Sequence, residues 1–338
     1  MSQEMKKLNG IAVAGNILTD NVKFVESYPE KGMLATIESE SLAVGGCVPN
    51  TGIDLKRLDK NLEVKAFGKI GCDDKGKYVL KRMREEGLDV SAVKTCDGVA
   101  TSYSDVITVK STGERTFFHN RGANALFNRD DVRLSEITQK IFHIGYLMLL
   151  DSFDKVDENG QTSMGSLLKD IRATGVKTSV DIVSESSGNF RKVAFAALPY
   201  CDYVIINEIE AGAIAGVNVR KPNGELCENR VKEAAYALAE AGVKEKIVIH
   251  CPEMGFALDK SGKFTVVPSR KLKKGFIKGS VGAGDAFCAG SLYALYNSYS
   301  DEDMLDFANL VAVNCLSAPD SVSGVTSIDR LNDVLNEK

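Results

Sequence analysis

Residues 142 to 183 read FHIGYLMLLDSFDKVDENGQTSMGSLLKDIRATGVKTSVDIV, and this stretch decides the fold. Two short apolar runs, FHIGYLMLL and VKTSVDIV, flank an amphipathic segment that ends at Gly175. Each apolar run predicts a buried strand, and the segment between them predicts a helix that is followed by a left-handed glycine. Strand, helix and strand in this order predict a parallel β-α-β unit.

The same alternation continues downstream. Further units read YVIINEIEAGAIAG at 203–216, VKEAAYALAEAG at 231–242 and KIVIHC at 246–251. Val and Ile occupy both parities of these runs, which is typical of strands that are buried on two faces. A final helix is expected over DEDMLDFANLVAVNCLSA, with Asp301 to Asp303 in its first turn. The sequence therefore predicts an α/β fold with helices around a parallel sheet.

Two segments depart from this rhythm and alternate like half-exposed strands. They lie at about 23–44 and 101–119, and the second is expected to be a hairpin that turns at 111–114. Because both interrupt the first β-α units, they predict a small sheet that projects over one edge of the main body as a lid. We expect one domain over residues 1–338, with the lid drawn from about 20–44 and 99–120.

Composition excludes several classes of function. A formal charge of −4 offers no footprint for nucleic acid or anionic lipid, and no stretch is apolar enough to span a bilayer. The N-terminal apolar run is too short for a signal peptide, so we expect a cytoplasmic protein. Eight cysteines without a CxxC pair indicate neither disulfides nor zinc. Three scattered histidines argue against metal catalysis through imidazole and against a Ser-His-Asp triad.

The strongest chemical signal is KGSVGAGDAFCAGSLYALY at 278–296, a glycine-rich turn that opens into a helix. Gly282, Ala283 and Gly284 expose backbone N–H groups at the helix N-terminus, where a phosphate is the natural occupant. Asp285 follows in the first turn, positioned to take a proton from an attacking hydroxyl. The alternative is structural: a tight turn followed by an acid that complements the helix dipole.

A second glycine-rich segment, VGGCVPNTGIDLKRL at 44–58, also precedes an amphipathic helix. Gly45 and Gly46 allow a ligand to approach the backbone, and Asn50 offers a donor and an acceptor to a polyol. The structural alternative is a turn with Asn50 as a helix cap.

A third segment, NEIEAG at 207–212, follows the strand YVII. Carboxylate and amide oxygens at the carboxyl end of a parallel strand suit hydrated Mg²⁺, so Asn207 and Glu210 are expected to hold magnesium through water. The alternative is a helix start at which the acidic side chains only complement the dipole.

Together these segments resemble the ribokinase-like (PfkB) carbohydrate kinase family, from GNILTD at 15–20 to GVTS at 324–327. The resemblance implies a Rossmann-like αβα sandwich with a β-sheet lid, ATP as phosphate donor, and a possible homodimer through the lid. It also matches the family's GxIGxDxxG stretch to residues 68–76. The implied sugar ligands are Asp20, Gly45, Gly46 and Asn50. The implied catalytic and nucleotide-side residues are Gly282, Ala283, Gly284 and Asp285, the pair Asn207 and Glu210, and Asp181 near the phosphates.

Some positions depart from the family pattern. Cys47 replaces the lysine of GGKGAN, which weakens the case for ribose. Gly279 replaces an acid that contributes to a monovalent-cation site in some members, which argues against potassium activation. The nucleotide loop reads HCPEMG, so His250 and Gly255 are expected beside the nucleotide, and Pro252 alters the loop. ATP is therefore the expected donor, with ADP and GTP left open.

The substrate is indicated only by class. The segment ERTFFHNRGAN ends a lid strand. Its polar side chains are expected to contact hydroxyls or a carboxylate, a solvated loop being the alternative; they are His119, Asn120, Arg121 and Asn124. A hexose, a pentose and a sugar acid all remain candidates. Two other functions are weighed: a nucleoside kinase of the same fold, and a non-catalytic sugar or nucleotide sensor. An oxidoreductase is disfavoured because no GxGxxG follows the first strand.

Overall fold

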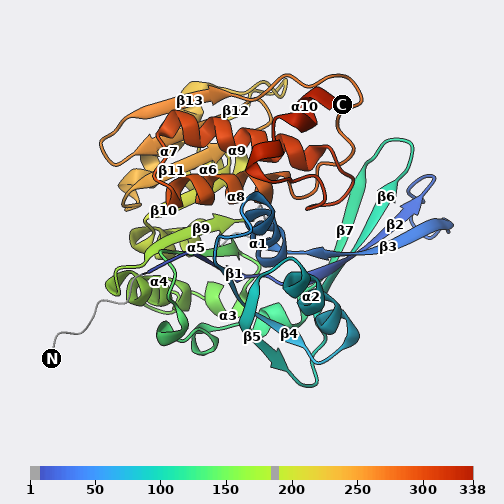
Figure 1. Cartoon of the computed structure of the whole chain (residues 1–338), viewed down its shortest axis with the longest axis horizontal. Helices are drawn as coiled ribbons and strands as arrows, with labels where there is room; N and C mark the ends of the chain where they lie inside the picture. The colour runs from blue at the N-terminus through green and yellow to red at the C-terminus, as the bar shows by residue number, and fades with distance from the viewer. Residues whose placement is uncertain (1–7, 184–189, 338) are drawn as a thin grey trace.

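The computed structural model describes residues 8–183 and 190–337, and the main layer of these residues is a nine-stranded sheet (Figure 1). Seven neighbouring strands are parallel, and the last two along one edge are antiparallel. In spatial order the strands are β13 (Phe264–Pro268), β12 (Met254–Asp259), β11 (Lys246–His250), β10 (Tyr203–Asn207), β9 (Lys177–Ile182), β8 (Ile141–Leu147), β1 (Ile11–Gly15), β4 (Val64–Gly71) and β5 (Asp89–Cys96).

The strand order reverses beside β1. From β1 the chain proceeds to β4 and β5 on one side, whereas β8 to β11 follow one another on the other side. The register is fixed by Ile11, which lies opposite Val64 on β4 and Ile141 on β8. In an open parallel sheet the carboxyl ends of the strands at such a reversal border a crevice in which ligands bind.

Helices cover both faces of the sheet, and each face has its own apolar core. One face packs against α3 (Asp151–Asp154), α4 (Ser163–Ala173), α5 (Phe190–Ala197), α6 (Glu208–Ala215) and α7 (Glu228–Glu240). The other packs against α1 (Cys47–Leu58), α2 (Asp74–Glu85), α8 (Ala283–Tyr296), α9 (Asp301–Leu316) and α10 (Asp333–Glu337). Short 3-10 turns occur at Gly122–Leu126, Arg129–Asp131, Leu134–Glu136, Leu198–Tyr200 and Ile328–Arg330.

The expected helix ends are confirmed. Gly175 and Gly242 follow α4 and α7 with φ angles of +89° and +112°, a backbone region that only glycine adopts readily. Helix α9 begins after Ser300, whose hydroxyl accepts from the Asp303 N–H, and three acidic residues occupy its first turn. The antiparallel strands β12 and β13 were not part of the predicted alternation.

A second sheet of four strands projects from the main body (Figure 1). Its order is β3 (Ile37–Gly45), β2 (Leu18–Val25), β6 (Ser102–Val109) and β7 (Arg115–Asn120). β2 and β3 enter after β1, and β6 and β7 enter after β5, so two separate insertions build one lid. The αβα sandwich with a small β-sheet lid is confirmed. In the part of the chain that is described, no helix is both long and apolar enough to cross a membrane.

Candidate active site

The start of α8 forms a turn that only glycine can make. Gly282 caps the helix with φ +81°, and a Cβ at this position would lie 2.5 Å from the Ser321 carbonyl oxygen. The N–H of Ala283 makes only a long contact of 3.5 Å with the Ser280 carbonyl. The N-terminus of α8 has no side-chain cap, so amides of its first turn are available to a ligand.

Asp285 projects from this turn and is 7% exposed. Its Oδ2 accepts a hydrogen bond from Asn50 Nδ2 at 2.9 Å. The Tyr146 hydroxyl donates to both carboxylate oxygens, at 2.7 Å from Oδ1 and 2.8 Å from Oδ2. Side chains from α1, β8 and α8 therefore meet at one carboxylate.

Helix α1 carries Asn50, and the glycines before it bring the lid close. A Cβ at Gly45 would lie 2.4 Å from Asp20 Oδ2, and one at Gly46 would lie 2.5 Å from the Asn16 carbonyl oxygen. The side-chain oxygen of Asn50, Oδ1, accepts from Ser321 Oγ at 2.9 Å, and the side-chain nitrogen, Nδ2, faces Asp285. Small residues at 45 and 46 therefore let a lid carboxylate and the α1 amide share one space.

Neighbouring strands add polar groups at their carboxyl ends. β9 contributes Asp181 and β10 ends at Asn207. Asn207 and Glu210 form a capping box on α6: Asn207 Oδ1 accepts from the Glu210 N–H and Glu210 Oε2 accepts from the Asn207 N–H, both at 2.9 Å. The capping alternative weighed for this pair is thus present, and both side chains also line the cavity described next.

A cavity of about 580 Å³ joins these groups between the sheet edge, the lid and α8. The lid side is lined by Leu18, Asp20, Ser104, Phe117 and His119; the body side is lined by Gly46, Asn50, Tyr146, Leu149, Asp181, Ile182, Val183, Asn207, Glu210, His250, Val281, Gly282, Gly284 and Asp285. Predicted sugar-side and phosphate-side residues therefore face one space.

Four acidic side chains line the cavity: Asp20, Asp181, Glu210 and Asp285. Burial raises the pKa of Asp285, while the hydrogen bonds from Asn50 and Tyr146 oppose that rise. The pKa of Asp181 is raised well above its usual range, by burial and then by the charges of Glu210 and Asp285. Burial also raises the pKa of Asp20 to about 7, and the charge of Asp285 contributes.

The carboxyl groups that line the cavity would suit a divalent cation. No described group of three or more His, Cys, Asp or Glu side chains forms a ready-made metal site. Asp181, whose pKa is raised by burial and by the charges of Glu210 and Asp285, lies with the oxygens of Asn207 and Glu210 along the cavity, and such a set suits a hydrated Mg²⁺ held by one or two protein oxygens. The donor set is therefore compatible with magnesium.

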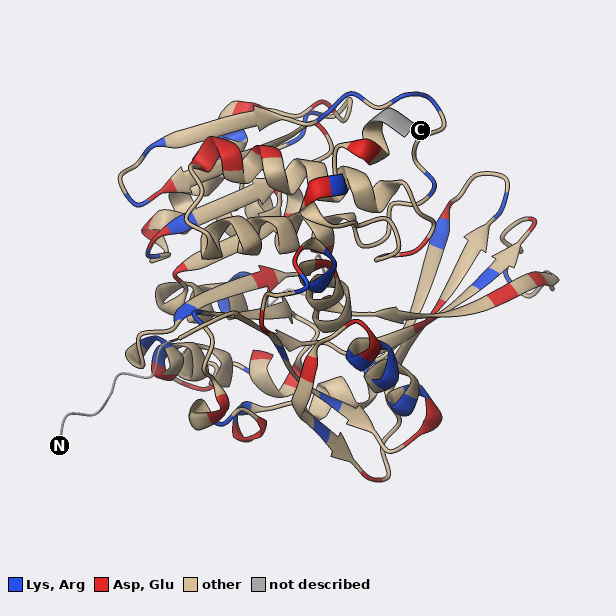
Figure 2. Cartoon of the chain, viewed as in Figure 1, with Lys and Arg blue, Asp and Glu red and all other residues tan. Residues whose placement is uncertain are grey.

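Positive charge gathers on the chain segment that leads into α8. Figure 2 shows Lys and Arg along the connection from β13 to α8, which carries Arg270, Lys271, Lys273, Lys274 and Lys278. This chain segment leads directly into the glycine turn of α8.

Some predicted residues lie beside the cavity rather than along it. Arg121 Nη1 donates to the Met148 carbonyl at 3.0 Å and to Asp151 at 2.7 Å. Asn124 is fully buried and accepts from the Ile17 N–H. Asn120 ends β7 one residue beyond the lining residue His119, and Gly255 packs against Phe287 and Leu305.

Sequence reasoning missed Tyr146, Ser104 and Phe117 as lining residues. Tyr146 is the polar group near the carboxyl end of FHIGYLMLL, an otherwise apolar strand, and that position was the available signal. Ser104 and Phe117 belong to lid strands, where only the register decides which parity faces inward.

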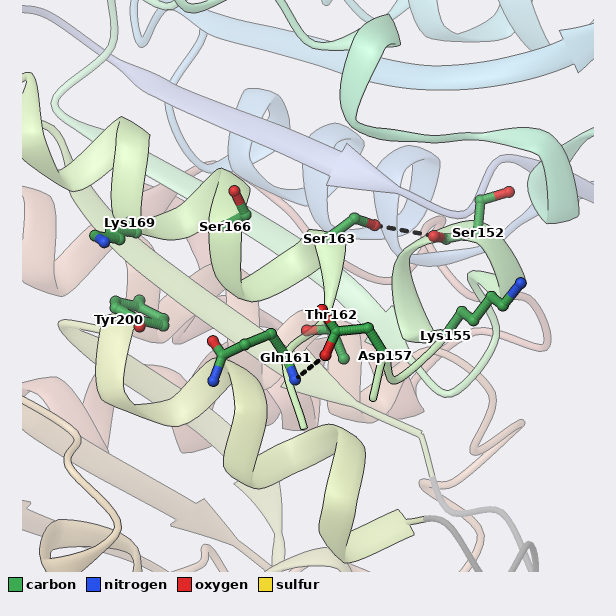
Figure 3. Close-up of a pocket in the computed structure, with 9 residues that line it drawn as sticks. All are labelled: Ser152, Lys155, Asp157, Gln161, Thr162, Ser163, Ser166, Lys169 and Tyr200. Carbon is green, nitrogen blue, oxygen red and sulfur yellow. Dashed lines mark hydrogen bonds between the residues drawn. The ribbon is translucent and has the colours of Figure 1, made fainter. Parts of the chain in front are cut away.

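A separate cavity lies beside α4, away from these groups (Figure 3). Its hydrogen bonds join Ser163 to the Ser152 carbonyl and the Gln161 N–H to Asp157, with Tyr200 and Lys169 along the rim. Its carboxylate, Asp157, accepts from the Gln161 N–H, and the Thr162 hydroxyl caps the N-terminus of α4 by accepting from the Gly165 N–H. The turn before α8 has no side-chain cap, so the α8 cavity is the candidate active site.

Comparisons with known proteins find similarities over most of the chain. A family model described as pfkB family carbohydrate kinase matches residues 9–326. The chain is 25% identical over 272 residues to a 2-dehydro-3-deoxygluconokinase of Escherichia coli, covering 79% of this chain and 86% of that one. It is 23% identical over 334 residues to a ribokinase of Schizosaccharomyces pombe, covering 94% and 96%.

Solved structures show the same fold. The Arabidopsis thaliana ribokinase complexed with ribose and ATP has a TM-score of 0.78 at 17% identity, over 97% of this chain and 99% of that one. An Escherichia coli protein in complex with ATP and Mg²⁺ has a TM-score of 0.76 at 16% identity, over 98% and 100%.

Proposed function

The chain belongs to the pfkB family of carbohydrate kinases, and on that premise we propose that it transfers the γ-phosphoryl group of ATP to a hydroxyl of a neutral sugar. The observation that carries this proposal is the buried Asp285 carboxylate beside the open amides of the α8 turn, in a cavity that also holds Asp20 and Asn50.

The proposed reaction uses Asp285 as general base. Asp285 takes the proton of the sugar hydroxyl as its oxygen attacks the γ-phosphorus, and the bond to the bridging oxygen breaks to release ADP. The amides of Gly282 to Gly284 stabilise the charge on the migrating phosphoryl group. Asp20 and Asn50 orient the sugar. Closure of the lid keeps water, a competing acceptor, out of the cavity.

The donor is proposed from two features. Solved relatives of the same fold hold ATP, and the chain segment that enters the α8 turn is rich in Lys, which would attract an anionic nucleotide. Asp181 and His250 would lie along the nucleotide, and Asn207 and Glu210 would hold Mg²⁺ through water. When bound, Mg²⁺ neutralises charge on the phosphates. ADP and GTP are the alternative donors, and use of ATP supports a cytoplasmic location.

The lining of the cavity favours a neutral sugar. None of the described residues that line it is Lys or Arg, whereas Arg115 lines an adjoining cavity that shares Phe117 and Glu210 with it. A substrate carboxylate would therefore have no cationic partner within the cavity itself. Asp20, Ser104 and His119 offer hydrogen bonds to hydroxyls, and Phe117 and Leu149 provide an apolar wall. That wall is also the observation that favours the second candidate, a nucleoside, whose base would stack on Phe117.

The test is nucleotide consumption with Mg²⁺ across D-fructose, D-ribose, 2-dehydro-3-deoxygluconate, fructosamine and nucleosides. Turnover with a neutral sugar supports the proposal, and turnover with only the sugar acid or only nucleosides contradicts the substrate class. Absence of turnover across the panel would favour a non-catalytic sensor. The same assay with ADP and GTP as donors identifies the nucleotide.

We also propose that two copies associate through the lid. Apart from Phe117, which lines the cavity, its strands and their connection expose large hydrophobic side chains. Those that are at least 44% exposed are Tyr28, Met33, Leu34, Ile37, Leu42 and Phe118. Exposed apolar groups gathered on a small sheet are typical of a protein interface.

A further inference from the structure

The Tyr146 hydroxyl holds the catalytic carboxylate in an unusual way. It lies 2.7 Å from one oxygen of Asp285 and 2.8 Å from the other, so that it sits across the open side of the group. Asn50 Nδ2 donates to Oδ2 from α1 at 2.9 Å. The carboxylate is thus engaged on both oxygens before any sugar is bound.

An acceptor hydroxyl needs the same position. To lose its proton to Asp285, an alcohol must place its O–H within hydrogen-bond distance of a carboxylate oxygen. Asp285 is nearly buried, and both it and Tyr146 line the cavity, so an alcohol that enters the cavity meets the carboxylate beside the phenol. The phenol O–H is itself an alcohol-like donor, so it competes with that alcohol for the carboxylate oxygens.

Resting on the proposed role of Asp285, we propose that the Tyr146 hydroxyl takes the place of the sugar hydroxyl in the unliganded enzyme and is displaced from Asp285 when the sugar binds. Tyr146 is then a positioning residue that couples the base to the presence of substrate. In this proposal the sugar hydroxyl takes over the hydrogen bond that the phenol otherwise donates to Asp285.

The same contact keeps water from the base while no sugar is present. A water molecule beside Asp285 would be activated toward ATP as the sugar hydroxyl is, and ATP would be hydrolysed without product. The phenol does not itself attack ATP in place of the sugar hydroxyl, because it keeps its proton. Burial and the charge of Asp285 raise the pKa of Tyr146 well above its usual range.

The test is Tyr146→Phe, which removes the hydroxyl and keeps the ring. We expect the Kd for the sugar that gives turnover in the panel, beginning with D-fructose, to fall by about 2- to 10-fold, because the sugar no longer competes with an internal hydrogen bond. Sugar-independent ATP hydrolysis should rise several-fold. Tyr200→Phe, in the separate cavity of Figure 3, is the matched control and should change neither.

An unchanged or higher Kd in Tyr146→Phe would overturn the proposal, since a group that only contacts the sugar or only supports the fold cannot tighten binding when it is removed. Asp285→Asn separates the two ideas: if it retains turnover, the proposed function fails, whereas if it is inactive and Tyr146→Phe binds no tighter, only the displacement fails.

Wild-type protein provides an independent readout should Tyr146→Phe not fold. The chain has ten tyrosines and no tryptophan, so its near-ultraviolet absorption reports tyrosine hydrogen bonding. Displacement predicts a tyrosine difference spectrum that saturates with added sugar, and a spectrum that stays constant at saturation contradicts it.

Discussion

Replacing Asp285 by Asn should separate activity from stability. The substitution keeps the shape of the side chain and removes its charge and its basicity. Loss of a general base costs about 10²- to 10⁴-fold in rate, so we expect kcat to fall by that factor. An amide oxygen still accepts from Tyr146 and Asn50, which occupy the same positions around it.

The free energy of unfolding of the same variant should increase. Changing the acceptor from charged to neutral weakens the bonds from Tyr146 and Asn50 by about 1 kcal/mol each. Against this loss, a nearly buried charge that raises the pKa of Asp20 and Asp181 is removed, and such a charge costs several kcal/mol to bury. The net effect is a stabilisation of about 1–3 kcal/mol, seen as a rise of a few degrees in Tm.

The assay pairs coupled ADP release at saturating sugar with thermal unfolding. Asp301→Asn is the matched control, because Asp301 is equally buried at 7% exposure in the first turn of α9 but pairs with Lys246. That variant should lose stability and keep turnover.

A kcat for Asp285→Asn within about tenfold of wild type would refute the role of Asp285 as general base. A lower Tm for Asp285→Asn would show that the weakened hydrogen bonds outweigh the removal of the buried charge.

Three further predictions follow from burial, backbone geometry and exposure. Asp20, with a pKa near 7 in the fold against 3.8 ordinarily, lowers stability as pH rises from about 4 to 7; Asp20→Asn should therefore raise Tm at pH 8 and leave it unchanged near pH 4, and an equal shift at both pH values contradicts this. Gly282→Val should lower kcat by about 10²-fold or more, whereas Gly275→Val, at a similar φ of +84° but with no neighbour within 4 Å, should not; equal kcat losses would count against the amide site. Phe118→Asp should shift a lid-mediated dimer to monomer in light scattering, unlike Ile209→Asp on α6, and an unchanged mass would exclude this interface.

The sequence predicted the parts of the fold that local patterns encode. Alternating strands and helices, glycine helix ends and the two half-exposed lid segments are each visible within about 20 residues. The antiparallel edge formed by β12 and β13 was not foreseen, because its strands are short and follow the last predicted unit. The turn before α8 could be located because glycines at a helix start leave backbone N–H groups uncovered for an anion, and an aspartate follows them directly in the sequence.

Contacts across the fold could not be predicted in the same way. The meeting of Tyr146 with Asp285 depends on β8 and α8 being adjacent, which follows from the strand order rather than from either segment. The lid residues show the same limit. Whether Phe117 and His119 or their neighbours face inward is set by the register of β6 with β7, and a shift of one residue would reverse it.

The junction at Gly45 and Gly46 has a mechanical consequence. β3 ends at Gly45, and the next residue caps α1, the helix that carries Asn50. Two residues without side chains therefore connect the lid sheet to α1, and Asn50 on this helix donates a hydrogen bond to the Asp285 carboxylate. We expect a tilt of the lid sheet to rotate the first turn of α1. Closure of the lid over a sugar would then also reposition Asn50 against Asp285, so that the two changes occur together.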